Sequence, residues 1–312
     1  MHKRYALVGG QLKEGGDEVP RIDIYTNPTP PEKDELISGW KVDEHDLASA
    51  LDPEEVSRLD VEGERLFIVW KRPKHFSFQE TASFDVGSIG IFLERDRLVV
   101  VQPDEAPLFE DRRMRPYRSL NELFLRHLQG SVNHYLGHLR AIKQVSREAE
   151  VRLSKSMENE VFLQMFALSE SLIYYINALE ANAGVLSRLQ NLAPKLRFTA
   201  EEIELLDDLA IDNRQCQRQA EIYASVMTGL MDARGNIVNN NMNVLLKNLT
   251  IINVVFLPLN LIASIGGMSE FSVITQSVPW PLSYGLFGVA MVVLGIATWK
   301  VLNRRIERRK PE

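Results

Sequence analysis

The chain has 312 residues, 45% of them hydrophobic, so it is long enough for more than one domain and for a sizeable buried core. Its formal net charge of −6 argues against nucleic acid as the main partner, because phosphate backbones are bound by clustered Lys and Arg. The single cysteine, Cys216, allows no disulfide within the chain and indicates a reducing compartment.

The N-terminal part, residues 1–117, is predicted to form a mixed α/β domain. Its short β-rich runs are Leu66–Trp70, Ser88–Phe92 and Leu98–Gln102. The polar residues 94–97 separate the last two runs, which predicts a β-hairpin. The segment Asp43–Leu59 is predicted to be helical, with Asp52-Pro53 interpreted as a helix start signal.

The next part, residues 118–198, is predicted to contain two antiparallel helices over 118–192. Ser119 precedes a long stretch that is poor in glycine and proline, and a break near residues 154–156 separates the two helices. Pro194 lies beyond the end of the second helix. This part is therefore expected to be a helical hairpin.

A third helix is predicted to begin at a capping box, Thr199 to Glu202, in which each side chain binds a backbone N–H of the other residue. No proline follows until Pro258, so we expect one helix from about residue 200 to 266, roughly 100 Å long. Residues 199–248 would form a stalk that continues into a membrane span. A single chain cannot bury such a helix, so we expect it to pack in an oligomeric bundle.

Two uncharged segments, 249–268 and 280–299, are each long enough to cross the hydrocarbon core of a bilayer as a helix. The second has a tryptophan at each end, as expected of aromatic belts at the two membrane interfaces. A pair of buried core helices is the competing interpretation, but such helices seldom lack a polar face over this length. Both segments are therefore predicted to be transmembrane helices.

The charges around the spans predict the topology. The short connection 269–279 has Glu270 as its one charge, whereas the tail 300–312 contains six basic residues, Lys300, Arg304, Arg305, Arg308, Arg309 and Lys310. The positive-inside rule places the tail in the cytoplasm and the connection outside. Two spans return the chain to the side from which it starts, and residues 1–15 contain no apolar leader. We therefore expect a two-pass protein of a bacterial-type inner (plasma) membrane, with both termini cytoplasmic.

The first span contains two asparagines, Asn253 and Asn260, which lie on one helical face because they are seven residues apart. The residues that share or flank this stripe are Leu246, Leu249, Thr250, Leu257 and Ser264. An amide in hydrocarbon is costly, so it normally faces a bundle interior or water. Two interpretations stay open at this point: a pore for partly hydrated cations, and hydrogen bonding between helices without conduction.

Elsewhere, His127, His134 and His138 lie on one face of the first long helix. The spacing of His134 and His138 suits two ligands of one metal ion, although packing histidines show the same spacing. No glycine-rich phosphate loop and no nucleophile elbow is present, so the sequence does not support an enzyme. The only ligands that we expect are divalent metal ions, as cargo or as regulators.

Three motifs resemble the CorA-type divalent metal ion transporters, including the zinc-transporting ZntB branch. They are Asn240–Thr250, Phe256–Asn260 and Gly266–Ser269, and the order of domains agrees along nearly the whole chain. The resemblance implies a CorA-like funnel: an α/β cytosolic domain, a long helical stalk and two C-terminal transmembrane helices, assembled as a homopentamer. It also implies that the first span lines a central pore and that the second lies outside it.

By position, the resemblance assigns roles to several residues. Asn253, Leu257 and Asn260 are similar to pore-lining residues, and Leu246 and Leu249 to part of a hydrophobic gate. Gly267, Met268, Ser269 and Glu270 would form the pore entrance. Asp208, with Asp207 beside it, falls near an acid of the family's intersubunit metal-sensing site, although a solvated acidic face is the alternative interpretation.

The entrance departs from the family pattern at one position. Ser269 stands where the family has an asparagine, and a serine is shorter and offers a hydroxyl in place of an amide carbonyl. Our leading hypothesis is a channel-like homo-oligomeric transporter of Zn2+, Mg2+, Co2+ or Ni2+. The alternatives are a non-selective or tension-gated pore, and a membrane scaffold or metal sensor that transports nothing.

Overall fold

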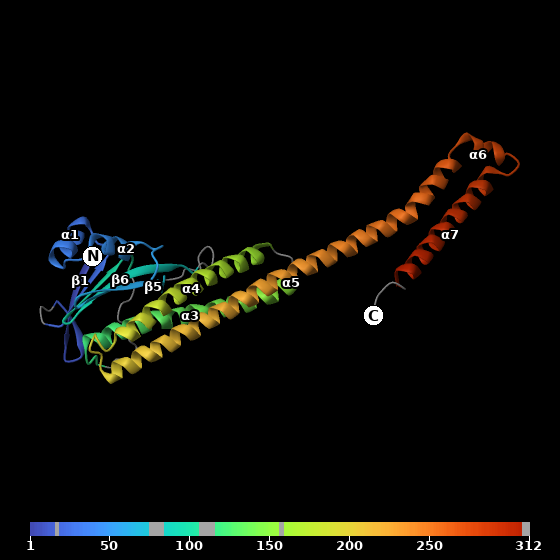
Figure 1. Ribbon diagram of the computed structural model, residues 1–312. Helices are drawn as coiled ribbons and strands as arrows, with labels where there is room; N and C mark the ends of the chain where they lie inside the picture. The colour runs from blue at the N-terminus through green and yellow to red at the C-terminus, as the bar shows by residue number, and fades with distance from the viewer. Residues whose placement is uncertain (16–18, 75–83, 106–115, 156–158, 308–312) are drawn as a thin grey trace. The chain divides into compact units, whose positions relative to one another are not determined.

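The structure is a computed structural model that describes residues 1–15, 19–74, 84–105, 116–155 and 159–307 (Figure 1). It separates into two compact units, Met1–Met231 and Asp232–Glu312. The first unit contains β1 (His2–Val8), β2 (Gln11–Glu14), β3 (Arg21–Thr26), α1 (Pro30–Gly39), α2 (Glu44–Leu51), β4 (Arg58–Glu62), β5 (Arg65–Pro73), β6 (Val86–Glu94), β7 (Arg97–Gln102), α3 (Leu120–Lys155) and α4 (Asn159–Leu192). Helix α5 (Ala200–Gly266) begins in the first unit and ends in the second, which also holds α6 (Ser269–Ile274) and α7 (Trp280–Glu307).

The strands form one mixed sheet in the order β2-β1-β3-β7-β6-β5-β4. Strands β3 and β7 pair in parallel, and the other neighbours pair antiparallel. The predicted hairpin is confirmed as β6 and β7, which are closed by the pair Glu94 and Arg97. The run Leu66–Trp70 is confirmed as part of β5.

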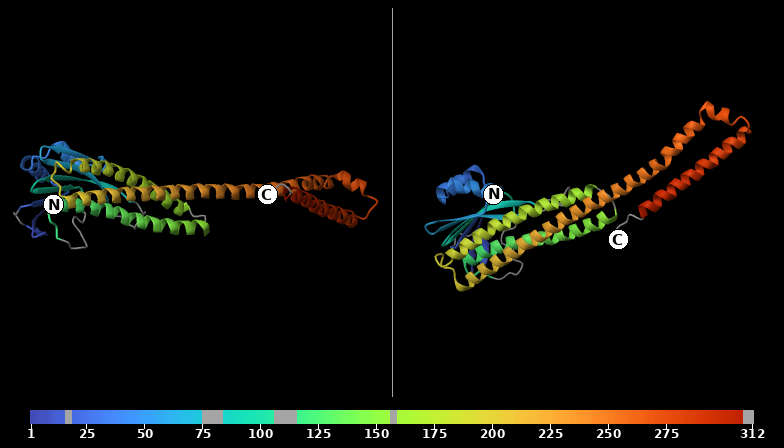
Figure 2. Two further views of the ribbon diagram at one scale, coloured as in Figure 1. Left: turned by 60° about the horizontal axis from the view of Figure 1, so that its bottom comes forward. Right: turned by 45° about the vertical axis from the view of Figure 1, so that its right-hand side comes forward.

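The central strands β5 and β7 contain uninterrupted apolar runs, Leu66–Trp70 and Leu98–Val101, and helices cover both faces of the sheet (Figure 2). In β5, the side chains of Leu66, Ile68 and Trp70 belong to the core that faces α3 and α4. Phe67 and Val69, which alternate with them, pack in the core under α1 and α2. Alternate residues of an extended strand point to opposite faces, so a strand covered on both sides needs apolar residues at every position.

The predicted helix over Asp43–Leu59 is wrong beyond residue 51. Asp43 is the N-cap of α2, and its side chain accepts a hydrogen bond from the backbone N–H of His45 at 2.8 Å. Asp52 is extended, with φ −83° and ψ 116°, because a residue before proline avoids the helical conformation. Asp52-Pro53 therefore ends this helix instead of starting one, and the chain returns to the sheet as β4.

The two predicted helices are confirmed as α3 and α4, and the link 156–158 lies outside the described residues. The predicted capping box at Thr199 is also confirmed: its backbone N–H donates to Glu202 at 2.8 Å, and its hydroxyl accepts from the Glu202 N–H at 3.3 Å. Helix α5 then extends to Gly266, as predicted. Contacts of Ser119 with Glu202 and of Ser146 with Met227 show that α3 and α5 are parallel.

A buried amide joins this helical layer to the sheet. The side chain of Asn182, on α4, accepts hydrogen bonds from the Ser57 hydroxyl at 2.7 Å and from the Lys71 backbone N–H at 3.1 Å. It also donates to the Lys71 backbone carbonyl at 2.8 Å. Strand β4 pairs with β5 only as far as Val69, so the Asn182 amide takes the place of a strand partner for Lys71.

In the second unit, α5 and α7 pack closely because two glycines lie at their contact. A Cβ added at Gly266 would lie 2.5 Å from Cζ of Phe287, and one at Gly295 would lie 3.3 Å from Cδ1 of Leu259. The helices are therefore antiparallel, and the connection between them includes the short helix α6, which the sequence patterns did not predict. Apolar side chains along this hairpin are exposed, for example Leu257 at 69% and Leu286 at 71%, which argues against soluble core helices.

Candidate functional site

The predicted polar stripe lies on the side of α5 that α7 does not cover. Asn253, Leu257, Asn260 and Ser264 are all exposed within the single chain. The residues of α5 that contact α7, Leu259 and Gly266, lie about 120–140° around the helix from Asn253. The second span therefore shields the opposite face and leaves the amide stripe for another partner.

The hydrogen-bonding groups on this stripe differ in how they are satisfied. The Thr250 hydroxyl donates to the Leu246 carbonyl one turn earlier at 2.8 Å, which satisfies it within the helix. Among the described residues, no hydrogen bond reaches the side-chain amides of Asn253 or Asn260. Each amide carries a carbonyl acceptor and an NH2 donor, and both groups remain available to water, to a cation shell or to a neighbouring chain.

Apolar residues continue the stripe at the end of the span that lies away from α6. Leu246 and Leu249 are 53% and 55% exposed, although both are large and apolar. They precede Asn253 by two turns and one turn on the same side of α5. Several copies of this helix around one axis would place a ring of leucines before the first ring of amides.

The predicted entrance motif lies where the hairpin turns. Gly266 ends α5, and the Gly267 and Met268 backbone N–H groups donate to Ala263 at 3.0 Å and to Ile265 at 3.1 Å. Ser269 begins α6. The side chain of Glu270 lies outside the described residues. The motif is thus located at the end of the amide stripe, and its role at a pore entrance stays a prediction.

The four predicted metal ligands of the first unit are not brought together. His134 and His138 are neighbours on α3, with ring centroids 4.4 Å apart, and His138 Nδ1 lies 2.5 Å from the Tyr175 hydroxyl. On α5, Asp207 accepts a hydrogen bond from Gln190 at 2.6 Å, and Asp208 is exposed. The described residues contain no group of three or more His, Cys, Asp or Glu side chains that could hold a metal ion. Metal binding by Asp207, Asp208 and His134 stays a prediction that would need ligands from another chain, whereas His138 is only 3% exposed within the single chain.

The third histidine of this face, His127, predicts how the stability of the protein depends on pH. Burial, and to a smaller extent the charge of Arg72, lowers the pKa of His127 from 6.5 to about 4. The unfolded chain then binds an extra proton between these two values, so the free energy of unfolding should fall as the pH drops. Between pH 7.5 and pH 5, we expect the free energy of unfolding to fall by about 2 kcal/mol less in His127→Leu than in the parent protein. Urea unfolding of the full protein in detergent would measure this difference. The same pH dependence in both proteins would contradict this assignment.

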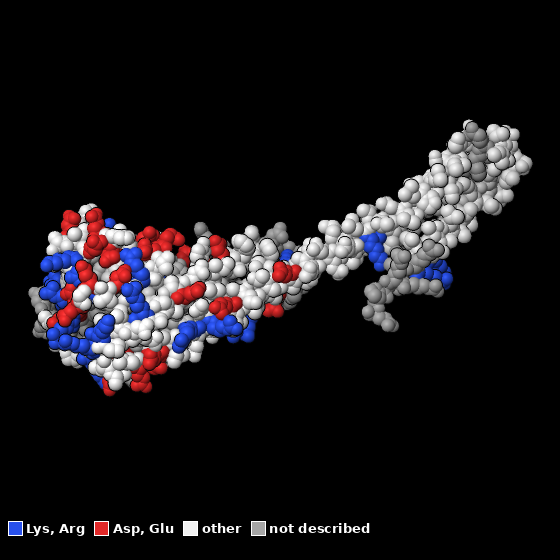
Figure 3. Space-filling model, in the orientation of Figure 1, with Lys and Arg blue, Asp and Glu red and all other residues white. Residues whose placement is uncertain are grey.

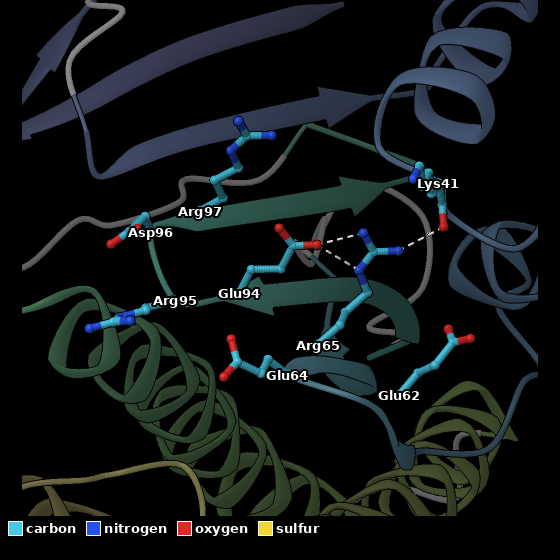
Figure 4. Close-up of a pocket in the computed structure, with 8 residues that line it drawn as sticks. All are labelled: Lys41, Glu62, Glu64, Arg65, Glu94, Arg95, Asp96 and Arg97. Atoms are coloured by element: carbon cyan, nitrogen blue, oxygen red, sulfur yellow. Dashed lines mark hydrogen bonds and ion pairs between the residues drawn. The ribbon is translucent and has the colours of Figure 1, made fainter.

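A hollow lies at the end of the sheet in the first unit, with a volume of about 470 Å³ (Figure 4). Its lining is charged: Lys41, Glu62, Glu64, Arg65, Glu94, Arg95, Asp96 and Arg97. The Arg65 guanidinium donates to Glu94 and, at 2.7 Å each, to the backbone carbonyls of Trp40 and Lys41. Through these hydrogen bonds the Arg65 guanidinium fixes the connection between α1 and α2. Arg65 therefore has a structural role in this hollow.

Comparison with known proteins decides the family. The model of the CorA-like Mg2+ transporter protein family matches residues 24–305, which is most of the chain. The chain belongs to the CorA family. Its predicted family and fold class are therefore confirmed, and it is a divalent cation transporter of the membrane with two candidate transmembrane helices near its C-terminus.

A curated relative and two solved structures match most of the chain. The cobalt/magnesium transport protein CorA of Methanocaldococcus jannaschii is 26% identical over 257 residues, which cover 80% of this chain and 79% of the relative. The complete structure of the CorA magnesium transporter of that organism has a TM-score of 0.80 at 21% identity and covers 97% of this chain and 98% of its own. The full-length CmaX structure has a TM-score of 0.74 at 16% identity and covers 97% of this chain and 96% of its own.

A solved cytoplasmic domain is also similar to this chain. The cytoplasmic domain of ZntB from Vibrio parahaemolyticus has a TM-score of 0.61 at 12% identity, and covers 77% of this chain and 97% of its own. At this identity the likeness concerns the fold alone. It agrees with the sheet and long helices described above.

The sequence predicted the amide stripe, but it did not predict the contact between α5 and α7 that covers the opposite side of α5. Gly266, Phe287 and Gly295 make the close approach between α5 and α7. A signal was present, because Leu259 and Gly266 repeat the seven-residue spacing of Asn253 and Asn260 on another side of the helix. Small residues at such positions are typical of membrane helices that pack closely.

Proposed function

We propose that this protein is a channel-like transporter that conducts divalent metal cations through a central pore formed by α5 helices of a homo-oligomer, a homopentamer by family resemblance. The observation that supports this proposal is the exposure of the Asn253–Asn260 stripe on the side of α5 opposite the α7 contact. In a bilayer, amides on such a side would be costly against lipid and favourable around water. Copies of α5 packed around one axis would turn them inward, with α7 outside.

The neutral side chains of the stripe favour a cation that keeps part of its water. Mg2+ dehydrates reluctantly, and amide oxygens can receive the water molecules of its shell without binding the ion too tightly to leave. The relative from Methanocaldococcus jannaschii is described as a cobalt/magnesium transport protein, which supports Mg2+ or Co2+ as cargo. Zn2+ and Ni2+ are the other candidates. Ser269, at the position of the family's asparagine, would alter selectivity at the entrance.

The proposal includes orientation and regulation. The basic residues of the segment 300–312, which begins inside α7, support cytoplasmic termini in a bacterial-type inner membrane, with the segment around α6 on the outer side. Asp207 and Asp208 on α5, with the half-buried His134 on α3, are proposed as points where cytosolic metal acts between subunits. His138 is left out of this proposal because it is buried against Tyr175. Divalent metal ions are thus both the cargo and the proposed regulators.

Flux into sealed vesicles tests this function. The purified full-length protein would be reconstituted, and entry of Mg2+, Co2+, Ni2+ and Zn2+ would be followed with ion-sensitive dyes, with and without a proton gradient. We expect divalent flux well above that of protein-free vesicles and well above K+ flux. No flux above protein-free vesicles would favour the scaffold or sensor, and equal K+ flux would favour the non-selective pore.

A further inference from the structure

Helices α5 and α7 meet along one stripe of residues on each helix. In the span 280–299 and the turn after it, the partly buried residues of α7 recur every three or four positions, which places them on one face. They are Ser283, Phe287, Met291, Gly295, Thr298 and Leu302. The matching stripe of α5 is Ile251, Val255, Pro258, Leu259, Ile262 and Gly266. All other residues of the spans 249–268 and 280–299 are exposed within the single chain.

Shape, not charge, determines how these two stripes fit together. Between Gly235 and Trp299 the sequence contains two charged residues, Lys247 and Glu270, and neither belongs to a stripe. Figure 3 shows the second unit as largely uncharged on the face displayed. Membrane helices associate through close packing, so the sizes of the facing side chains set the position of α5 on α7.

The tightest point of this contact is Gly266. Among the described residues of the second unit, Gly266 is the one that is buried. A Cβ added there would lie 2.5 Å from Cζ and 3.0 Å from both Cε atoms of Phe287. A phenylalanine ring turns about only two torsion angles, so a side chain at residue 266 would displace either the ring or the end of α5. The ring of Phe287 therefore fixes the last turn of α5.

The predicted entrance segment, Gly267–Ser269, is joined directly to this last turn. The Gly267 N–H donates to the Ala263 carbonyl at 3.0 Å and to the Ser264 carbonyl at 3.2 Å, and the Met268 N–H donates to the Ile265 carbonyl at 3.1 Å. These bonds attach the entrance backbone to the final carbonyls of α5. Any displacement at Gly266 is thus passed on to Met268 and Ser269.

We propose that Phe287 is a positioning residue for cation selection: its ring, seated on Gly266, determines where the entrance segment Gly267–Ser269 lies. This inference rests on the pore of the function proposed above. Selection among cations depends on how far the oxygen ligands lie from the ion and its water, so a small shift of the entrance changes the affinity. Phe287 acts through Gly266 and has no contact with the cation in this role.

Flux of Co2+ into vesicles tests the positioning role. We expect Gly266→Ala to raise the Co2+ concentration that gives half-maximal flux by about fivefold or more, because the added methyl group displaces the entrance. Phe287→Leu shortens the facing side chain, so the combined variant Gly266→Ala/Phe287→Leu should return to within about twofold of the parent. Size-exclusion chromatography and thermal unfolding in detergent would accompany each measurement.

The matched control is Gly295→Ala, the same substitution at the other close contact. A Cβ at Gly295 would lie 3.3 Å from Cδ1 of Leu259, and Leu259 is seven residues, or about 10 Å, from Gly266 along α5. We expect half-maximal flux within about twofold of the parent. An equal effect of Gly295→Ala and Gly266→Ala, parent-like flux in Gly266→Ala, or no rescue by Phe287→Leu would overturn the proposal.

A thiol label reports the entrance without any need for flux. Cys216 is the single cysteine and is buried, and Met268 is 52% exposed, so Met268→Cys in a Cys216→Ala background provides one reactive thiol in the entrance segment. We expect Gly266→Ala to raise its rate of reaction with a maleimide about threefold or more, Phe287→Leu to reverse this, and Gly295→Ala to leave it unchanged. Phe287→Leu alone leaves a gap over Gly266 and should raise the same rate, so this variant decides if Gly266→Ala does not assemble.

The two readouts separate this inference from the proposed function. The expected labelling pattern in a protein without divalent flux would contradict conduction and support the positioning of the segment by Phe287. Divalent flux in the parent, with labelling and half-maximal flux that do not respond to Gly266→Ala, would contradict the positioning role alone.

Discussion

Asn253→Ala combined with Asn260→Leu is expected to lower divalent cation flux into vesicles by at least about tenfold. Each amide lost removes a polar contact to the ion's water shell, and such contacts with charged species contribute about 1.5–3 kcal/mol. The added leucine would also narrow and dry the path. The measurement is initial flux per reconstituted oligomer, with size-exclusion chromatography to show that assembly is unchanged.

The matched control is Asn248→Ala. Asn248 is also an exposed amide of α5, but it lies about 140° around the helix from Asn253. We expect its loss to change flux less than twofold, because its side chain would not face the axis. Unchanged flux in the Asn253/Asn260 variant would show that the stripe does not line the conducting path, and the pore assignment would have to be abandoned.

Asn182→Ala is expected to give the largest loss of stability, about 4 kcal/mol in the free energy of unfolding. The substitution leaves the Ser57 hydroxyl and both backbone groups of Lys71 without their partner, and a buried polar group without a partner costs about 1–3 kcal/mol. Denaturant unfolding of the full-length protein in detergent, followed by far-UV circular dichroism, would measure it.

Asn177→Ala is the control for this second prediction, because Asn177 lies on the same helix and is exposed. We expect that change to stay within about 0.5 kcal/mol of the parent. A loss below about 1 kcal/mol for Asn182→Ala would mean that the amide is not needed to complete the edge of β5 at Lys71.

The long helices and the spans could be predicted because their signals are local. A capping box at Thr199, the scarcity of proline and glycine, and uncharged runs of membrane length act within a few turns of the chain. The hairpin of β6 and β7 was also predictable, since both strands are buried runs joined by a polar turn. The long helices and the hairpin of β6 and β7 agree with the structure because their signals lie in neighbouring residues.

Elements that depend on distant partners were missed or misplaced. Strand β4 has an amphipathic, charged sequence, and it is a strand because β5 lies beside it. The Asp52-Pro53 pair is compatible with either the start or the end of a helix. In the structure it ends α2, because the chain returns to the sheet after it. Strands β1 to β3 are likewise assigned by pairing, since β3 joins β7 from more than seventy residues away.

By itself, the sequence determined that two apolar helices follow a long helix, that Asn253 and Asn260 share one face, and that basic residues lie on one side of the hairpin. Helical periodicity and charge are properties of neighbouring residues, and they need no fold to be recognised. The tertiary structure decided which face of α5 is covered. That choice depends on Gly266 and Gly295 meeting Phe287 and Leu259 across two helices, and only this packing leaves the amides uncovered.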